Sequence, residues 1–256
     1  MNMLAALRLQ IEWGADEALG DNPIDRMAAP APIRAERDIG AAERPSLPAA
    51  APVGHPVRRA EALAAGAATV EALLEALAGF DGCGLSSTAT KLVFADGDPT
   101  ARLMLVGDCP GAEEDRAGLP FVGPAGRLLD RMLASIGLDR SQVLLTTLVP
   151  WRPPGNRAPT ETEVQICLPF LLRHIALVRP ARLVLLGALA SHALLGTKGS
   201  IGRLRGRWTM AQVPGLPNPI PALPMLQPSL LLQNPASRRE AWVDLLSLRR
   251  SLDSGP

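Results

Sequence analysis

The sequence predicts an α/β fold with a mainly parallel sheet over residues 59–252. From residue 103 onward, short apolar runs alternate with longer segments whose apolar residues recur at helical spacing. The run at residues 184–187 is continuous, as is typical of a strand buried on both faces. Strands that alternate with helices of this length form β-α-β units with right-handed crossovers. We therefore expect one folded domain, built around a sheet.

The composition limits where the protein works and what it binds. The net charge of +1 neither requires nor excludes nucleic acid, so any basic surface must be local. Three widely spaced cysteines form no disulfide framework and suit a reducing cytoplasm. No stretch is apolar enough to span a membrane, and the N-terminus lacks the pattern of a signal peptide. We expect a cytoplasmic protein without a membrane partner.

Two segments precede the expected domain. Residues 1–19 carry apolar residues at helical spacing and predict an amphipathic helix. Residues 20–58 are rich in Pro and Ala and keep no apolar period, which predicts a disordered linker. We expect the helix to dock on the protein or to stay solvated. Binding of a protein partner through this N-terminal arm is the alternative.

The domain is expected to begin with an Ala-rich helix over residues 59–79. Its apolar residues between 70 and 77 share one face, Thr69 can cap its second part, and Gly79 ends it. After a turn, the pattern of residues 91–95 predicts a short strand. The repeated units then follow in order as strand 103–106, helix 124–136, strand 142–149, helix 160–178, strand 182–187, helix 188–196, outer strands 204–210 and 221–226, and helix 235–252.

The strand at 103–106 ends in a stretch that could hold a ligand. Gly107 closes the strand, and Pro110-Gly111 forces a turn directly after Asp108. The carboxyl end of such a strand borders the crevice of an open α/β sheet, and Phe121 would offer a flat face for a planar ring. The alternative is a plain strand and turn, with the aromatic side chain filling space.

Two basic stretches could contact a nucleic-acid backbone. The loop at 149–157 follows the second core strand and contains Arg152, Asn156 and Arg157. In the stretch at 201–208, alternate residues are arginines, which would share one face of a strand. These are Arg203, Arg205 and Arg207. Solvated surface arginines are the alternative for both stretches.

Four of these segments together resemble the uracil-DNA glycosylase superfamily. In order, they read GDCPGAEEDRAGLPFVGPAG, WRPPGNRAPT, GRLRGRW and LQPSLLLQNPASRREAW. The sequence is most similar to family 4, the iron–sulfur type. The resemblance implies a three-layer α/β/α fold with a four-stranded, mainly parallel sheet. It also implies a base excision repair enzyme that flips uracil out of DNA and hydrolyses its N-glycosidic bond. The expected protein is a monomer, in a bacterial cytoplasm and associated with the nucleoid.

The resemblance also assigns roles to single residues. Asp108 and Gln227 stand at the catalytic positions, and Phe121 matches the aromatic residue that stacks on the base. The remaining base-pocket positions are Gly107, Cys109, Pro110, Gly111 and Thr147. The expected DNA-binding residues are Arg152, Asn156, Arg157, Arg203, Arg205, Arg207, Ser229 and Arg238.

Three pocket positions depart from the family pattern. Asp108 replaces a glutamate and shortens the carboxylate by one methylene. Thr147 replaces an asparagine, so it keeps a hydroxyl but lacks the paired donor and acceptor of an amide. Gln227 replaces a histidine and still presents a neutral N–H donor. We therefore expect weak or altered glycosylase activity. The alternative is a catalytically degenerate, DNA-binding homologue that acts through partners.

The family's iron–sulfur ligands are also incomplete. Family members carry four cysteines, whereas the corresponding positions here are Phe80, Cys83, Trp151 and Cys167. Two thiolates are too few for an ordinary four-iron cluster. We expect no metal and no cofactor, with Cys83 and Cys167 as remnants of the site. A 4Fe-4S cluster as in the family is the disfavoured alternative.

Overall fold

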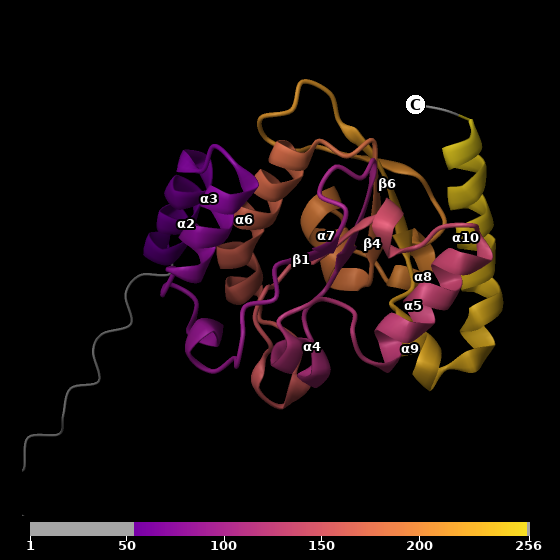
Figure 1. The fold of residues 1–256 in the computed structure, drawn as a ribbon, viewed down its shortest axis with the longest axis horizontal. Helices are drawn as coiled ribbons and strands as arrows, with labels where there is room; N and C mark the ends of the chain where they lie inside the picture. Colours follow the sequence, from indigo (N-terminus) through magenta and orange to yellow (C-terminus); the bar gives the residue numbers. More distant parts are fainter. Residues whose placement is uncertain (1–53, 255–256) are drawn as a thin grey trace, which may run out of the picture. The chain divides into compact units, whose positions relative to one another are not determined.

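The computed structural model describes residues 54–254, which form a sheet with helices packed on both faces (Figure 1). The strand order is β1-β3-β2-β4-β6-β5. The four inner strands pair in parallel, and both outer strands are antiparallel. The strands are β1 (Ala95–Gly97), β2 (Leu103–Gly107), β3 (Leu144–Thr147), β4 (Arg182–Leu186), β5 (Thr209–Ala211) and β6 (Ile220–Met225).

The α/β class and the parallel centre are confirmed, whereas the expected number of strands is wrong. The described sheet has six strands and not four, because β1 and β5 extend it at both edges. These two edge strands are only three residues long each. Short edge strands leave few unpaired backbone groups, which limits pairing with other chains.

Helices follow most of the expected segments. The α-helices are α2 (Gly54–Gly66), α3 (Val70–Ala78), α4 (Ala112–Ala117), α5 (Pro124–Ser135), α6 (Glu161–Val178), α7 (Ala188–Leu195), α8 (Ile201–Leu204), α9 (Pro228–Gln233) and α10 (Arg238–Asp253). The 3-10 helices are η1 (Gly84–Ser87), η2 (Arg140–Gln142), η3 (Pro154–Asn156) and η4 (Pro235–Ser237). The short helices α4 and α9 were not expected from the sequence.

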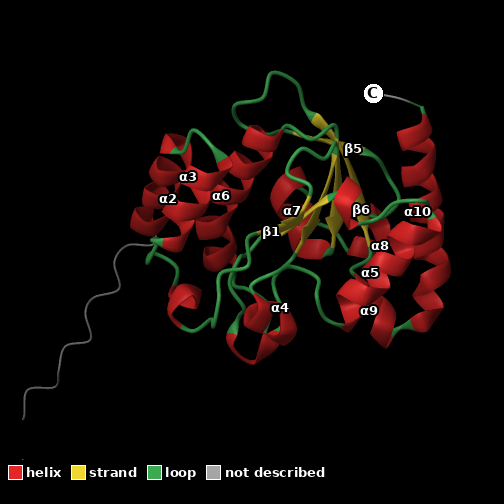
Figure 2. Cartoon of the chain, in the orientation of Figure 1, coloured by secondary structure: helices red, strands yellow, loops and turns green. Residues whose placement is uncertain are grey.

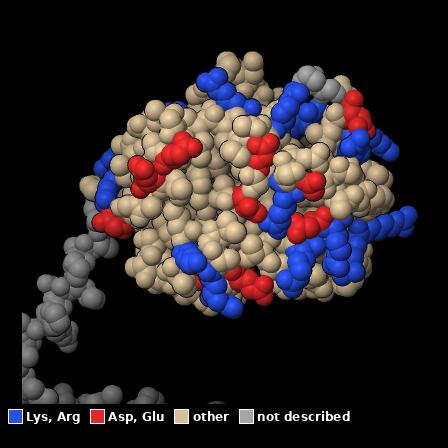
Figure 3. Space-filling model, in the orientation of Figure 1, with Lys and Arg blue, Asp and Glu red and all other residues tan. Residues whose placement is uncertain are grey.

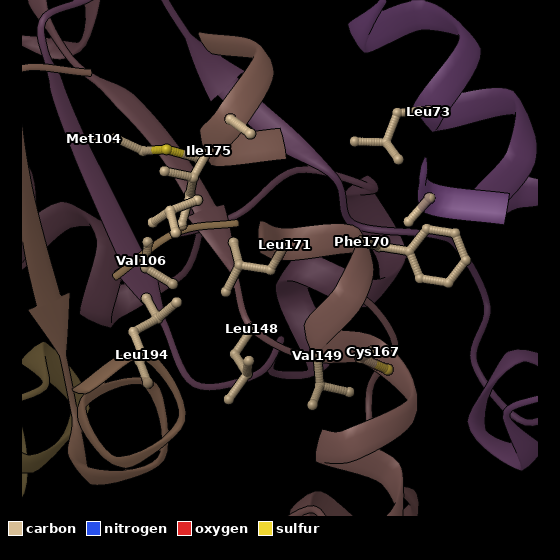
Figure 4. Packing of buried hydrophobic residues seen from close by; sticks show 14 of the residues in the cluster. Leu73, Met104, Val106, Leu148, Val149, Cys167, Phe170, Leu171, Ile175 and Leu194 are labelled. Atoms are coloured by element: carbon tan, nitrogen blue, oxygen red, sulfur yellow. The ribbon is translucent and has the colours of Figure 1, made fainter. Parts of the chain in front are cut away.

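The side chains of the inner strands alternate between two apolar layers. Met104 and Val106 of β2 join a cluster with α2, α3, α6 and α7, whereas Leu103 and Leu105 join one with α5 and α10. Figure 4 shows Met104 and Val106 beside Ile175 of α6. Because every residue of β2 is buried, the strand has no polar face. This two-sided burial explains the continuous apolar runs in the sequence.

Three boundaries differ from expectation. Thr69 does cap a helix, accepting a hydrogen bond from the Ala72 amide, but α2 and α3 are separate. Residues 54–58, expected in the linker, belong to α2. The expected strand at 91–95 is displaced to β1.

The expected strand at 204–210 is also wrong. Residues up to Leu204 are helical, and β5 starts only at Thr209. Between them, Arg205 turns inward to pair with Asp244, at 2.7 Å between Nη2 and Oδ1. Gly206 follows with a φ of +72°, in a conformation that favours glycine. This inward pair breaks the extended backbone that the alternating pattern predicted.

The predicted helix over residues 1–19 and the linker up to residue 53 lie outside the described residues. Within residues 54–254, no helix is long and apolar enough to cross a membrane.

Candidate active site at the carboxyl edge of the sheet

The inner parallel strands end along one edge of the sheet, where a cleft of about 480 Å³ opens. Gly107, Thr147 and Leu186 are register neighbours at this edge. The short helices α4 and α9 lie at the lower side of the view in Figure 2, beside the loops that leave these strands. The cleft is lined by Asp108, Cys109, Pro110, Gly111, Glu114, Phe121, Ala125, Thr147, Asn156, Arg157, Ala158, Pro159, Leu189, Gln227, Pro228, Ser229 and Gln233.

The structure brings most of the predicted pocket residues together in this cleft. Asp108, Cys109, Pro110, Gly111, Phe121, Thr147 and Gln227 all line it. Gly107 lies directly behind the Phe121 ring. A side chain at Gly107 would collide with that ring, since its Cβ would come within 2.6 Å of the ring's Cζ. The absence of a side chain at 107 therefore lets the ring lie against the end of β2.

Phe121 has a backbone conformation that the surrounding residues stabilise. Its φ of +55° lies in the left-handed region, which is uncommon for a bulky residue. The backbone of Gly126 in α5 lies so close to Phe121 that any Cβ at 126 would overlap the Phe121 carbonyl. Strained residues of this kind cluster at functional sites. The ring is thus fixed at one wall of the cleft.

Arg140 holds the Phe121 loop from outside the cleft. Its Nη2 donates a hydrogen bond to the Phe121 carbonyl. The same guanidinium pairs with Asp96 at 2.6 Å and with Asp130 at 2.8 Å. One side chain therefore links β1, α5 and the loop that carries the aromatic ring. No local sequence pattern indicates this role, because the partners lie far apart along the chain.

Glu114 joins the two loops that form the mouth of the cleft. Its carboxylate accepts hydrogen bonds from the amides of Gly111 (3.1 Å), Val122 (3.1 Å) and Gly123 (3.0 Å). Glu114 stands three residues after Gly111, the usual position of a capping glutamate. That spacing is a signal from which the role could have been predicted. The neighbouring Asp115 is buried and instead accepts from Thr90.

Asp108 is bonded to the start of α7. Its Oδ1 accepts a hydrogen bond from the Ala190 amide at 2.8 Å. Burial raises the pKa of the Asp108 carboxyl to about 6, although the amides of Ala190 and Leu189 oppose the shift. The group is therefore a carboxylate at neutral pH and takes up a proton in mildly acidic solution.

The hydroxyl of Thr147 is buried and has no hydrogen-bond partner in the described part of the protein. Buried polar groups are normally paired, so an unpaired hydroxyl on a residue of the cleft lining makes Thr147 a candidate contact for a bound ligand. Gln227 stands just before α9, and its side chain does not cap that helix. Both side chains are thus left with hydrogen-bonding capacity in the cleft.

Cys109 is not suited to nucleophilic chemistry. Burial raises the pKa of its thiol to about 12, and the neighbouring Asp108 carboxylate adds to the shift. Since the thiolate is the reactive form of cysteine, this residue stays protonated and inert. It contributes shape to the cleft.

The predicted DNA-binding residues fall into two groups. Asn156, Arg157 and Ser229 line the cleft. Arg157 also forms a two-pronged pair with Glu163, which lowers the pKa of that carboxyl to about 2. Arg152 donates to Asn156 at 2.7 Å and so braces the loop. The other predicted residues lie outside the cleft lining, and these are Arg152, Arg203, Arg205, Arg207 and Arg238.

The remnants of the cluster site are buried in the apolar cluster that α2, α3 and α6 form with the sheet. Cys83 and Cys167 are both buried, and each thiol shifts the pKa of the other, that of Cys83 downward and that of Cys167 upward. Phe80 is also buried and packs on Phe170, with ring centroids 5.2 Å apart. Trp151 is buried as well. Among the described residues, no group of three or more His, Cys, Asp or Glu could hold a metal. The residues present do not fit a four-thiolate cluster.

Comparisons with known proteins point to one family. The family model for the Uracil DNA glycosylase superfamily matches residues 94–246, from the edge of β1 into α10. A type-4 uracil-DNA glycosylase of Pyrobaculum aerophilum is 34% identical over 180 residues, which are 69% of this chain and 91% of that protein. A type-4 enzyme of Thermotoga maritima is 39% identical over 159 residues, covering 59% and 77%. A type-5 uracil-DNA glycosylase of Thermus thermophilus is 36% identical over 118 residues, covering 40% and 53%.

Proposed function

Because the chain belongs to the uracil-DNA glycosylase superfamily, we propose that it removes uracil from DNA in base excision repair. The reaction hydrolyses the N-glycosidic bond of a uracil that has been flipped out of the DNA. The main observation in support is the joint position of an aromatic ring, a carboxylate and an amide side chain in one cleft. These belong to Phe121, Asp108 and Gln227.

Each group has a physical task in this reaction. A flipped base loses its stacking in DNA, at a cost of a few kcal/mol, and the Phe121 ring offers a replacement surface. As the bond breaks, negative charge grows on the uracil, and the Gln227 amide can donate a hydrogen bond to it. The positive charge that develops on the sugar is stabilised by the Asp108 carboxylate, which also positions the attacking water. Thr147 contacts the polar edge of the base with its free hydroxyl.

Charged and polar residues at the rim would hold the DNA backbone. Arg157, Asn156 and Ser229 line the cleft and are the best placed of the predicted DNA-binding residues. Phosphate contacts of this kind position the nucleic acid and carry no sequence information themselves. Arg157 stays 44% exposed despite its pair with Glu163. Arg205 is less suited, because it lies outside the cleft lining and is only 16% exposed beside the buried Asp244. Action as a monomer, and partner binding through the N-terminal arm, stay predictions.

We propose further that the enzyme works without an iron–sulfur cluster. The two thiols that remain are too few for one, and Phe80 and Trp151 fill the adjoining space with buried rings. Apolar packing among α2, α3 and α6 then stabilises the part of the protein that contains Cys83 and Cys167. No step of the proposed reaction passes through a metal.

A second reading is a DNA-binding homologue with little or no activity. The observation in its favour is that two side chains expected to hydrogen-bond the uracil differ from the family pattern. Thr147 stands in place of an asparagine, and Gln227 stands in place of a histidine. A hydroxyl makes fewer paired contacts with a uracil edge than an amide does.

The deciding experiment uses purified full-length protein with single- and double-stranded oligonucleotides that contain one uracil. We expect alkali-labile sites at the uracil and none in a thymine control. DNA binding without strand cleavage at an excess of protein would support the second reading. The Asp108→Asn variant serves as the control for trace contamination by another glycosylase.

A further inference from the structure

A second concave surface lies on the other side of α9 from the cleft. We call it the α5–α10 groove. Its volume is about 220 Å³, and six apolar side chains form its floor and walls: Leu128, Met132, Leu231, Ala241, Trp242 and Leu245. The reaction proposed above assigns no role to any of these residues. In α9, Ser229 faces the cleft and Leu231 faces this groove, so the two sites share a helix but no lining residue.

The groove leaves a large aromatic side chain accessible to solvent. Trp242 is 43% exposed, and the adjacent Val243 is 59% exposed. The chain has only four tryptophans and four phenylalanines. An exposed tryptophan therefore leaves one of few large aromatic side chains outside the core. Exposed tryptophan at the edge of an apolar hollow is typical of binding surfaces.

The rim of the groove is positively charged. Arg131 of α5 and Arg238 of α10 flank it, so Arg238, expected from the resemblance to bind DNA, lies in this groove and not in the cleft. Neither forms an ion pair with any acidic residue in the part of the chain that the structure describes, whereas Arg140, Arg157 and Arg205 all do. Figure 3 shows blue side chains gathered at the lower right, over the region where α5, α9 and α10 lie in Figure 1.

We propose that the α5–α10 groove binds an acidic segment of a partner protein, which inserts one bulky apolar side chain beside Trp242. The apolar floor matches such a side chain, and the rim arginines match flanking carboxylates. Apolar anchors give most of the affinity at such sites, and complementary charge gives orientation and speed of association. A volume of about 220 Å³ suits one anchor residue rather than a whole helix.

Two other occupants fit the groove less well. DNA phosphates would satisfy the arginines, but a nucleotide leaves the apolar floor uncovered and finds few polar partners for its base. A second copy of the chain in a two-fold dimer would place the same basic rim against itself, since each patch meets its own copy. Like charges would then face each other across the contact.

The test measures fluorescence anisotropy of a labelled peptide of Asp and Ser residues with one central Phe. Two matched peptides carry Ala in place of Phe, or Asn in place of Asp. With the full-length protein we expect the Phe peptide to bind about tenfold or more tightly than either control. The substitutions Trp242→Ala and Arg131→Glu should each weaken it by about tenfold.

Arg250→Glu is the matched charge control, because Arg250 lies at the far end of α10 and outside the groove lining. It should change the peptide affinity by less than about twofold. Arg131→Glu should leave uracil excision unchanged, which separates this site from the active cleft. Arg131 is exposed, so its substitution keeps the test valid even if Trp242→Ala lowers stability.

Several results would overturn the proposal. Equal binding of the three peptides, or no binding of the Phe peptide, would exclude an acidic apolar ligand. Equal losses in Arg131→Glu and Arg250→Glu would indicate general charge attraction. If Trp242→Ala weakened binding of a uracil-free oligonucleotide as much as that of the peptide, the groove would belong to the DNA surface. A dimer that Trp242→Ala dissociates would identify a second copy as the occupant.

Discussion

The carboxylate of Asp108 occupies the space that a side chain at Gly187 would need. Gly187 lies between β4 and α7 and has a φ of +117°, which other residues rarely adopt. The absence of a side chain at 187 therefore lets Asp108 reach the Ala190 amide. The Asp108 carboxylate, which follows β2, is therefore positioned by the backbone of the next parallel strand's connection, from Gly187 into α7.

We expect Gly187→Ala to displace Asp108 and to strain the backbone. The free energy of unfolding should fall by about 1–3 kcal/mol, as estimated for residues in sparsely populated conformations. Excision should fall as well, even at temperatures where the variant is fully folded. Chemical denaturation and the oligonucleotide assay measure the two effects. Gly202→Ala is the control, since nothing lies within 4 Å of an added Cβ there. A fully active Gly187→Ala would contradict this assignment.

The pKa of Asp108 predicts opposite effects of pH on activity and stability. The carboxyl has an ordinary pKa of 3.8 and a folded value of about 6. Between these values the folded protein binds a proton that the unfolded chain does not, so this group favours folding at low pH. That contribution is lost as the pH rises through about 6, while the reactive carboxylate forms. Excision should therefore rise with pH over the same interval.

The variant Asp108→Asn should lower excision and remove this step from the pH–rate profile. Asp244 offers a matched control, because burial raises the pKa of its carboxyl to about 6 as well, against the opposing effect of Arg205. Asp244→Asn should keep the step in the pH–rate profile. If the step disappeared in Asp244→Asn, the titrating group would be Asp244, and the assignment of the step to Asp108 would be wrong.

Substitution of Arg140 tests whether the position of Phe121 depends on this distant guanidinium. Arg140→Ala removes the hydrogen bond to the Phe121 carbonyl and two ion pairs. We expect the free energy of unfolding to fall by about 1–3 kcal/mol. We also expect KM for uracil-DNA to rise more than kcat falls, because base stacking is lost. Arg249→Ala removes a surface pair with Asp253 and a hydrogen bond to the Ile136 carbonyl, away from the cleft. It should cost about 1–2 kcal/mol with unchanged KM. Equal kinetic effects of both variants would argue against positioning.

Gln227→His restores the residue type of the family pattern at the donor position. If the Gln227 amide is poorly aligned, the substitution should raise the excision rate, by up to about 10²–10³-fold, the effect typical of one donor at a developing anion. Single-turnover kinetics with uracil-DNA measures the chemical step directly. Gln233→His is a control, because Gln233 also lines the cleft and carries no assigned role. If Gln227→His left the excision rate unchanged, the Gln227 amide would already donate a well-aligned hydrogen bond to the base.

The remnant cluster site predicts a colourless protein that gains metal binding on repair of the ligand set. Wild-type protein should contain no iron after anaerobic reconstitution. The double variant Phe80→Cys with Trp151→Cys completes four thiols near Cys83 and Cys167, and should turn brown under the same treatment. Loss of two buried rings should lower stability by about 3–5 kcal/mol each without metal. Phe80→Ser with Trp151→Ser controls for that loss. A brown wild-type protein would overturn the proposal that no cluster is present.

Residue patterns alone were enough to predict the parallel centre of the sheet. Its strands are buried on both faces, so their sequences are apolar at nearly every position, and the helices between them follow their own period. The carboxylate of the cleft could be predicted because Asp108 follows the end of β2 directly, whereas Phe121, beyond α4, was indicated as the one aromatic residue of the same Gly- and Pro-rich stretch. Local spacing carries this information, since neighbours in sequence are neighbours in the crevice.

Tertiary structure decided the features that depend on residues far apart in the chain. The inward turn of Arg205 toward Asp244 replaced an expected strand, because burial of a paired charge outweighed an alternating pattern. The contact of Asp108 with α7 likewise joins segments that the sequence separates. Long-range pairs leave no local period, so only the folded chain reveals them. The sequence by itself determined the class of fold and the chemistry of the cleft, and packing determined how each group is held.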